Sequence, residues 1–124
     1  MNRPPDVLQP GLIMDLLWAD PILDSGFRPG ARGASFGFGA DVLGQLLKLL
    51  NIDFVIRGHQ VVQDGYEFFG NRKLVTIFSA PHYCGQFDNA AAVMLVNDSL
   101  VCSFEIMRPT VGRAILKNTK VEFK

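Results

Sequence analysis

His59 is one of two histidines in the chain, and it follows a largely apolar run, Ile52–Ile56, that is typical of a buried strand. A histidine just beyond the end of such a strand is well placed to ligate a metal ion or to transfer a proton. A lone histidine is weak evidence for either role, and spacing alone favours a structural or surface role over chemistry. His59 is nevertheless the first candidate for chemistry.

A second candidate is the loop Ser79–Asn89, which places His82, Tyr83 and Cys84 among turn-forming residues. An aromatic-rich loop between strands is usually a packed turn, but a tyrosine can also line a pocket with its flat ring and its hydroxyl. Cys84 lacks a general base at a defined spacing, which argues against a nucleophilic cysteine. We interpret His82 as an ordinary surface residue, because one exposed imidazole seldom binds a metal alone.

Arg32 is the third candidate, because it lies in the glycine-rich segment GARGASFGFG. A guanidinium group can bind a phosphate or a carboxylate through two parallel hydrogen bonds. The alternative is a surface arginine in a flexible loop. The spacing of the glycines does not match a nucleotide-binding fingerprint, so a nucleotide site is not indicated.

The elements that must position these residues begin with a helix at Asp41–Leu50, whose leucines recur on one side at a helical period. Asp41 is the expected N-cap, and Asn51 can end the helix in the left-handed region. Before the helix, the glycine-rich segment Asp20–Gly39 is expected to be a long loop with little regular structure.

Five β-rich runs surround or follow the candidate residues, and several are too apolar for strands that are wet on one face. A turn at Asn97–Ser99 predicts that the last two runs form a hairpin. One helix cannot cover both faces of such a sheet, so we expect an α+β chain that lacks part of its domain. The five runs are Ile52–Ile56, Tyr66–Phe69, Leu74–Phe78, Ala91–Val96 and Leu100–Met107.

The composition is that of an ordinary globular protein, with 12 basic and 12 acidic residues. This balance does not indicate binding to nucleic acid or to a membrane surface. Two cysteines do not make a disulfide framework, so we expect reduced thiols and a cytoplasmic or nuclear protein. Basic residues are concentrated at the carboxyl end, and residues 110–124 are expected to be a solvated basic tail.

Several motifs in order resemble the carboxyl-terminal half of the catalytic domain of phosphoprotein phosphatases, and type-1 protein serine/threonine phosphatases most closely. The motifs are GLIMDLLWADP, ARGASFGFGADV, IRGHQ, DGYEFFG, SAPHYCGQFDN and LVCSFEIMRP. The resemblance assigns residues 1–109 to a metallophosphatase (calcineurin-like) domain, part of a β-sandwich flanked by helices. It implies hydrolysis of phosphoserine and phosphothreonine in phosphoprotein substrates, by water that two divalent metal ions (manganese, or iron and zinc) activate.

The same resemblance implies roles for individual residues. His59 matches a metal-ligating histidine, and Arg32 matches an arginine that contacts the substrate phosphate. Tyr83 matches a tyrosine of the active-site loop, and Trp18 matches a tryptophan of the groove beside the active site. Cys84 matches a loop cysteine that is not catalytic, whereas His82 stands where the family usually has asparagine.

A second implied site is a surface at which type-1 phosphatases bind an Arg-Val-x-Phe-type peptide of their regulatory subunits. The matching positions are Phe54, Phe68, Arg72, Val75, Leu100, Val101, Cys102 and Phe104.

The motifs Asp-x-His, Gly-Asp-x-Val-Asp-Arg-Gly and Gly-Asn-His-Glu, which supply most of the metal ligands and the general-acid histidine in this family, do not occur in the chain. One histidine cannot hold a dinuclear centre. We therefore expect a phosphatase domain fragment that neither holds the metal ions nor acts by itself. The alternative is a non-catalytic module that binds regulatory subunits.

Overall fold

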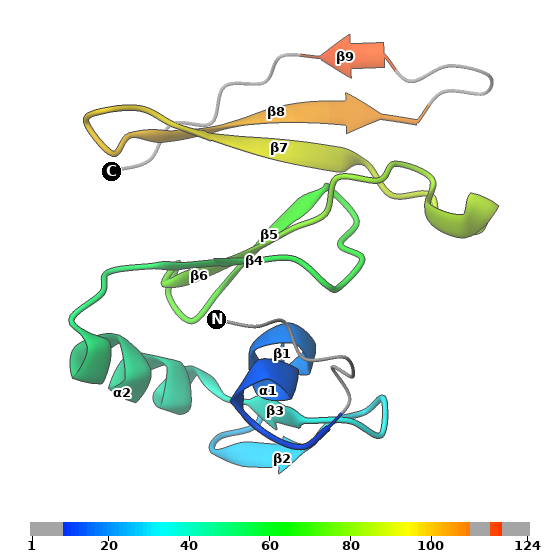
Figure 1. Ribbon diagram of the computed structural model, residues 1–124. Coiled ribbons are helices and arrows are strands. Elements are labelled where there is room, and N and C mark those ends of the chain that lie inside the picture. Colours follow the sequence, from blue (N-terminus) through cyan, green and yellow to red (C-terminus); the bar gives the residue numbers. More distant parts are fainter. Residues whose placement is uncertain (1–8, 110–114, 118–124) are drawn as a thin grey trace. The chain divides into compact units, whose positions relative to one another are not determined.

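The computed structural model describes residues 9–109 and 115–117, and in them the chain is an α+β fold, as the sequence predicts. The elements are α1 (Leu12–Trp18), β1 (Asp20–Pro21), β2 (Phe27–Pro29), β3 (Phe36–Phe38), α2 (Ala40–Leu50), β4 (Val55–Arg57), β5 (Tyr66–Phe69), β6 (Leu74–Ile77), η1 (Tyr83–Gly85), β7 (Ala91–Val96), β8 (Cys102–Arg108) and β9 (Ile115–Lys117). The strands form three sheets of three, in the orders β1-β3-β2, β4-β6-β5 and β7-β8-β9 (Figure 1). None of the helices in the described part is long and apolar enough to span a bilayer.

The chain divides into two compact units, of which the first comprises Met1–Val55 and Phe69–Lys73. Helix α2 buries Leu43 and Leu47 in this unit. At Gly70 the backbone φ is +57°, and an added Cβ would lie 2.9 Å from Leu43, so the turn approaches the helix closely. The predicted helix is confirmed, and Asn51 ends it in the left-handed region with φ 52°.

The start of α2 differs from the expectation. Gly39, and not Asp41, is the N-cap residue, and the amide of Leu43 donates to the Gly39 carbonyl. The Asp41 carboxylate instead accepts two 3.0 Å hydrogen bonds from the amide of Gly26. The Asp41 side chain therefore binds an amide 15 positions away instead of capping its own helix.

The segment Asp20–Gly39 was expected to be a long loop with little regular structure, whereas the structure shows three short paired strands in it. Strand β3 pairs in parallel with β1 and antiparallel with β2, with Gly37 opposite both Asp20 and Arg28. Gly37 is buried, and an added Cβ would lie 2.7 Å from Ile22. These strands are only two or three residues long, so pairing and close packing stabilise them rather than their own propensity.

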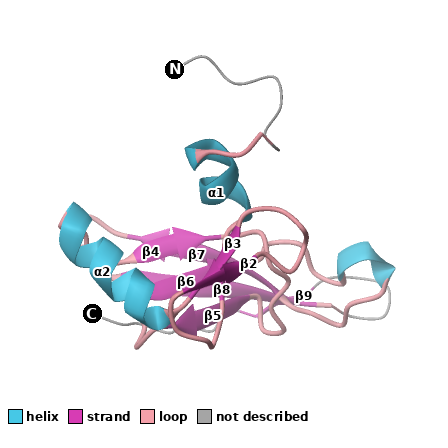
Figure 2. Ribbon diagram, turned by 90° about the horizontal axis from the view of Figure 1, so that it is seen from below, coloured by secondary structure: helices cyan, strands magenta, loops and turns pink. Residues whose placement is uncertain are grey.

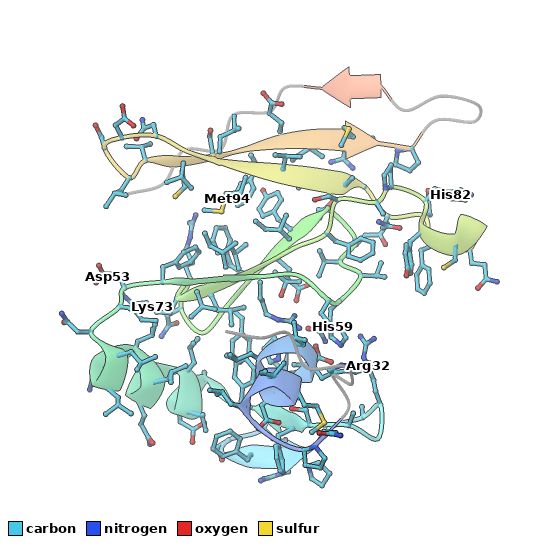
Figure 3. All side chains as sticks on the ribbon, in the orientation of Figure 1. Arg32, Asp53, His59, Lys73, His82 and Met94 are labelled. Atoms are coloured by element: carbon cyan, nitrogen blue, oxygen red, sulfur yellow. The ribbon has the colours of Figure 1, made fainter. Side chains whose placement is uncertain are left out.

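The second unit comprises Ile56–Phe68 and Leu74–Lys124, and contains most of the remaining strands. Strands β7 and β8 form the predicted hairpin (Figure 1). Within it, Met94 lies opposite Phe104. The Phe104 ring stacks on Tyr66 at 4.1 Å and meets Phe68 edge-on at 6.1 Å, so β8 packs on β5 through aromatic rings. Figure 3 shows Met94 on the same inner side of β7.

Two predicted strands start later than expected, and each has a local cause. At Ile52 the amide donates to the Leu47 carbonyl, so this residue still belongs to the end of α2, and β4 begins at Val55. At Leu100 the backbone φ is +59°, which is incompatible with an extended strand, so β8 begins only at Cys102.

The carboxyl-terminal region also differs from the expected solvated tail. Strand β9 pairs antiparallel with β8, with Ile106 opposite Lys117. The rest of the predicted tail, residues 110–114 and 118–124, lies outside the described residues.

Candidate functional site

His59 lies in the turn that follows β4, and it is half-buried (Figure 3). Its backbone is left-handed, with φ +78°, and its imidazole Nε2 is shielded from solvent. Positive φ is uncommon for residues with a Cβ, although less so for histidine than for most, and the local cost is offset by contacts of the folded chain. The turn therefore fixes the imidazole in a defined, shielded position at the end of a strand.

The loop after β6 contains the helical turn η1, which is the short unlabelled helix in Figure 2. Tyr83 is the first residue of this turn. The Tyr83 ring packs edge-on against Phe78 at 5.0 Å and lies 6.1 Å from Phe87, while the residue as a whole remains exposed. The tyrosine is thus held by neighbouring rings and still presents part of its surface to solvent, as a pocket wall requires.

Asn89 organises this loop, and sequence reasoning missed it. Its side chain is fully buried; the amide donates to the carbonyls of Ala80 and Ala90, both at 2.9 Å, and Oδ1 accepts from the Tyr83 amide at 3.0 Å. A buried amide with these partners fixes the backbone on both sides of η1. Only burial distinguishes Asn89 from an ordinary turn asparagine.

Two other loop residues occupy conformations that the sequence did not foretell. His82 and Cys84 have positive φ values of 50° and 56°, and both are exposed. Nδ1 of His82 lies 3.0 Å from the Phe87 carbonyl, so the ring closes the loop. His82 is therefore a surface residue with a local structural contact. Both cysteines of the chain are free.

In the first unit, Arg32 lies in the tight connection between β2 and β3. The connection is closed by hydrogen bonds from the Gly30 amide to the Ser35 carbonyl and from the Gly33 amide to the Gly30 carbonyl, both 3.0 Å. The Arg32 Nε lies 3.4 Å from a carboxylate oxygen of Asp20, whose side chain is 18% exposed. Asp20, which sequence reasoning did not single out, thus holds the guanidinium by one edge.

A hydrogen bond also ties this connection to α1, since the Ser35 hydroxyl donates to Asp15 at 2.7 Å. Trp18, the predicted groove residue, is the last residue of α1 and is half-buried. The first unit therefore contains Trp18 and Arg32, whereas His59 and Tyr83 belong to the second.

The positions predicted for regulatory-peptide binding are likewise divided between the units. Phe54 and Arg72 belong to the first unit. In the second unit, Phe104 and Val75 are buried, Phe68, Val101 and Cys102 are half-buried, and Leu100 is 79% exposed. The amides of Ser99 and Val101 donate to Oδ1 of Asn97, both at 2.9 Å, and shape the hairpin turn that presents Leu100.

A metal site needs several donor side chains that converge on one point. Among the residues that the structure describes, no group of three His, Cys, Asp or Glu side chains is arranged to hold a metal ion. His59 can therefore contribute one ligand, but these residues do not fit a complete metal site.

Comparison with known proteins identifies the class to which this fold and these motifs belong. The sequence profile of the family described as Calcineurin-like phosphoesterase matches residues 1–63. The chain therefore belongs to the calcineurin-like phosphoesterase family, whose members generally use divalent metal ions.

A solved structure gives a more specific likeness. A protein serine/threonine phosphatase from Saccharomyces cerevisiae, with similarity to human phosphatase PP5, superimposes with a TM-score of 0.72 and 31% sequence identity. The match covers 86% of this chain and 36% of the yeast chain, so the sequence spans about a third of that relative. These findings confirm the predicted phosphoprotein phosphatase catalytic-domain fragment, whereas the resemblance to type-1 enzymes in particular stays a prediction.

Proposed function

We propose that this chain contributes to the active site of a protein serine/threonine phosphatase, which hydrolyses phosphoserine and phosphothreonine at a dinuclear metal centre. The observation that carries the proposal is His59, an imidazole with a shielded Nε2 at the end of β4, in a chain of the calcineurin-like phosphoesterase family. A strand end followed by a fixed turn is a rigid support for a metal ligand. In the proposal, His59 supplies one ligand, and the other ligands come from outside the described residues.

Arg32 in the first unit and Tyr83 in the second each have a separate part in the proposal. Asp20 lies against Nε of Arg32, and a guanidinium group contacted there can still offer its two terminal nitrogens to phosphate oxygens. In the proposal, the Tyr83 ring, which is supported by Phe78, contacts the substrate with its exposed surface. The chemistry that the metal ions supply in this family, Lewis acidity and activation of water, is not available from these side chains, so the chain alone is proposed to be inactive.

A chimera tests this proposal. Residues 9–109 of this chain would replace the superimposed segment of the yeast phosphatase, and hydrolysis of a phosphoserine peptide would be measured with added manganese. We expect an active chimera, and we expect His59→Ala to lower kcat/KM by more than about 100-fold. The matched control is His82→Ala in the same chimera, which removes an exposed histidine and should retain activity.

Two results would contradict the proposal: a chimera whose His59→Ala variant is as active as its parent, or a folded chimera with no activity. The 124-residue chain with manganese is measured in parallel. Clear turnover by that chain would refute its proposed inactivity.

We also propose, as a second candidate function, that the chain binds Arg-Val-x-Phe-type peptides of phosphatase regulatory subunits. The supporting observation is the exposed Leu100 at the hairpin turn, close in sequence to the half-buried Val101 and Cys102. Exposed apolar side chains beside strand edges are features that an added peptide strand can use.

Peptide binding distinguishes the second function from the first, because it needs no metal ion. Fluorescence polarisation with a labelled Arg-Val-x-Phe peptide should show saturable binding, and Leu100→Asp should weaken it by about 10-fold. Leu23→Asp, at a fully exposed leucine of the first unit, is the control and should leave binding unchanged. Absence of binding to the folded chain would exclude this function.

The cytoplasmic or nuclear localisation stays a prediction from the sequence.

A further inference from the structure

The left-handed backbone at His59 requires a physical cause. The residue before it is Gly58, which could itself have accommodated unusual backbone angles, yet the positive φ of +78° falls on the residue that carries the imidazole. A side chain with a Cβ is disfavoured in this region, so other contacts must stabilise the turn.

Arg57 makes contacts of the required kind. Its Nη1 donates a 2.7 Å hydrogen bond to Oε1 of Gln60, and this bond links the residue before the Gly58–His59 pair to the residue after it. The same nitrogen donates to Oγ1 of Thr76 at 3.2 Å. Thr76 lies on β6, the neighbour of β4 in the sheet, and is 4% exposed.

These two bonds have different consequences. The bond to Gln60 closes the turn, because it fixes the distance between the side chains on either side of His59. The bond to Thr76 anchors the closed turn to a buried position of the sheet. A hydrogen bond to a charged guanidinium group in a partly buried setting is stronger than a neutral one at the surface.

We propose that Arg57 is a positioning residue that holds His59 in its left-handed conformation through Gln60 and Thr76. The proposal rests on the proposed function in one respect: the position of His59 matters for catalysis if His59 is a metal ligand. The conformation itself can be measured without a metal ion, so the two can fail separately.

Amide hydrogen exchange on the 124-residue chain, followed by NMR, tests the proposal. Thr76→Val removes the acceptor and nearly preserves the shape, and Gln60→Leu removes the other acceptor. Each variant should accelerate amide exchange at His59 and Gln60 by about 2- to 12-fold more than at Ala92. This factor is what the loss of one hydrogen bond predicts. The Ala92 amide is the reference because it donates to Phe78 at 2.9 Å within the core. The one-bond Cα–Hα coupling of His59, which differs between positive and negative φ, should shift in parallel.

Conservative variants separate positioning from general destabilisation. Thr76→Ser and Gln60→Glu keep an acceptor oxygen and should restore the parent exchange rate and coupling at His59. Ser79→Ala removes a different hydrogen bond of the same unit, to the Ala92 carbonyl at 2.8 Å, and should leave the His59 coupling unchanged.

The proposal is overturned if Thr76→Val and Gln60→Leu leave the exchange and the coupling of His59 as in the parent, or if they change all amides equally. If one of the two variants does not fold, the other decides by the same criteria. If neither folds, failure of Thr76→Ser and Gln60→Glu to retain the parent coupling overturns the proposal, and retention supports it.

Discussion

At the scale of single residues, Asp41 shows how a charged side chain can act through a hydrogen bond from a distant backbone amide. The Gly26 amide, which donates to both carboxylate oxygens of Asp41, holds the pKa of that carboxyl below its ordinary value of 3.8, with smaller contributions from amides at the start of α2. The bond joins the glycine-rich segment to the helix that follows it. Asn89 has a comparable role in the second unit, although it carries no charge.

The lowered pKa of Asp41 gives a pH-dependent prediction. A pKa that is lower in the folded state means that the ionised carboxylate stabilises the fold above the ordinary pKa, and that this contribution is lost as the pH falls through the folded value. Asp41→Asn should therefore lower the free energy of unfolding at neutral pH, and the difference from the parent should shrink as the pH falls below 3.8. Urea unfolding at a series of pH values measures this.

The control for this measurement is Asp98→Asn, at an exposed position of the hairpin turn. A difference between parent and Asp41→Asn that stays constant down to the lowest pH would contradict the assigned role of the Gly26 hydrogen bond.

At the scale of elements, the second unit depends on the close approach of a turn to strand β7. Gly65 has φ +81°, its amide donates to Val62, and its carbonyl accepts from Phe78 at 2.8 Å. A Cβ added at Gly65 would lie 2.4 Å from the Ala91 carbonyl carbon and 2.6 Å from the Ala92 nitrogen. Backbone atoms cannot move aside as the end of a flexible side chain can, so this position requires glycine.

Gly65→Ala should therefore lower the free energy of unfolding by more than about 3 kcal/mol, because it adds a steric clash to an unfavourable φ. Gly44→Ala is the matched control: it lies inside α2, an added Cβ meets nothing within 4 Å, and helix propensity predicts a gain of about 1 kcal/mol. Both are measured by denaturant unfolding. Equal stability of the two variants would show that the turn can move away from β7.

At the scale of the whole molecule, much apolar surface remains exposed among the described residues of each unit. In the first unit, Leu43 and Leu47 of α2 are buried, whereas Leu46 and Leu49 are 42% and 81% exposed. In the second unit, Val93 and Leu95 face outward from β7. Exposed apolar residues grouped in this way favour association.

The pair Leu46→Gln and Leu49→Gln should reduce concentration-dependent association in sedimentation velocity, and each should change the free energy of unfolding by only about 0.5 kcal/mol. Leu47→Gln, at a buried position of the same helix, should instead unfold the first unit. Unchanged association of the double variant would show that other surfaces cause it.

The sequence by itself determined the features that depend on neighbouring residues. The period of the leucines predicted α2, Asn51 predicted its left-handed end, and the turn residues after Val96 predicted the hairpin. The ordered motifs also determined the family, because they retain residue types at fixed spacing. For the helix, its left-handed end and the hairpin, the physical preference acts within a few positions of the chain.

Only the tertiary structure decided what depends on distant partners. The two- and three-residue strands β1 to β3 form because they pair with one another, and Asp41 leaves its local cap for Gly26. The left-handed turn at His59 coincides with contacts of Arg57 to Gln60 and to Thr76, a residue 19 positions away. Such contacts are set by packing rather than by local propensity. The sequence could therefore identify His59 as a candidate residue, but it could not predict the contacts that stabilise its conformation.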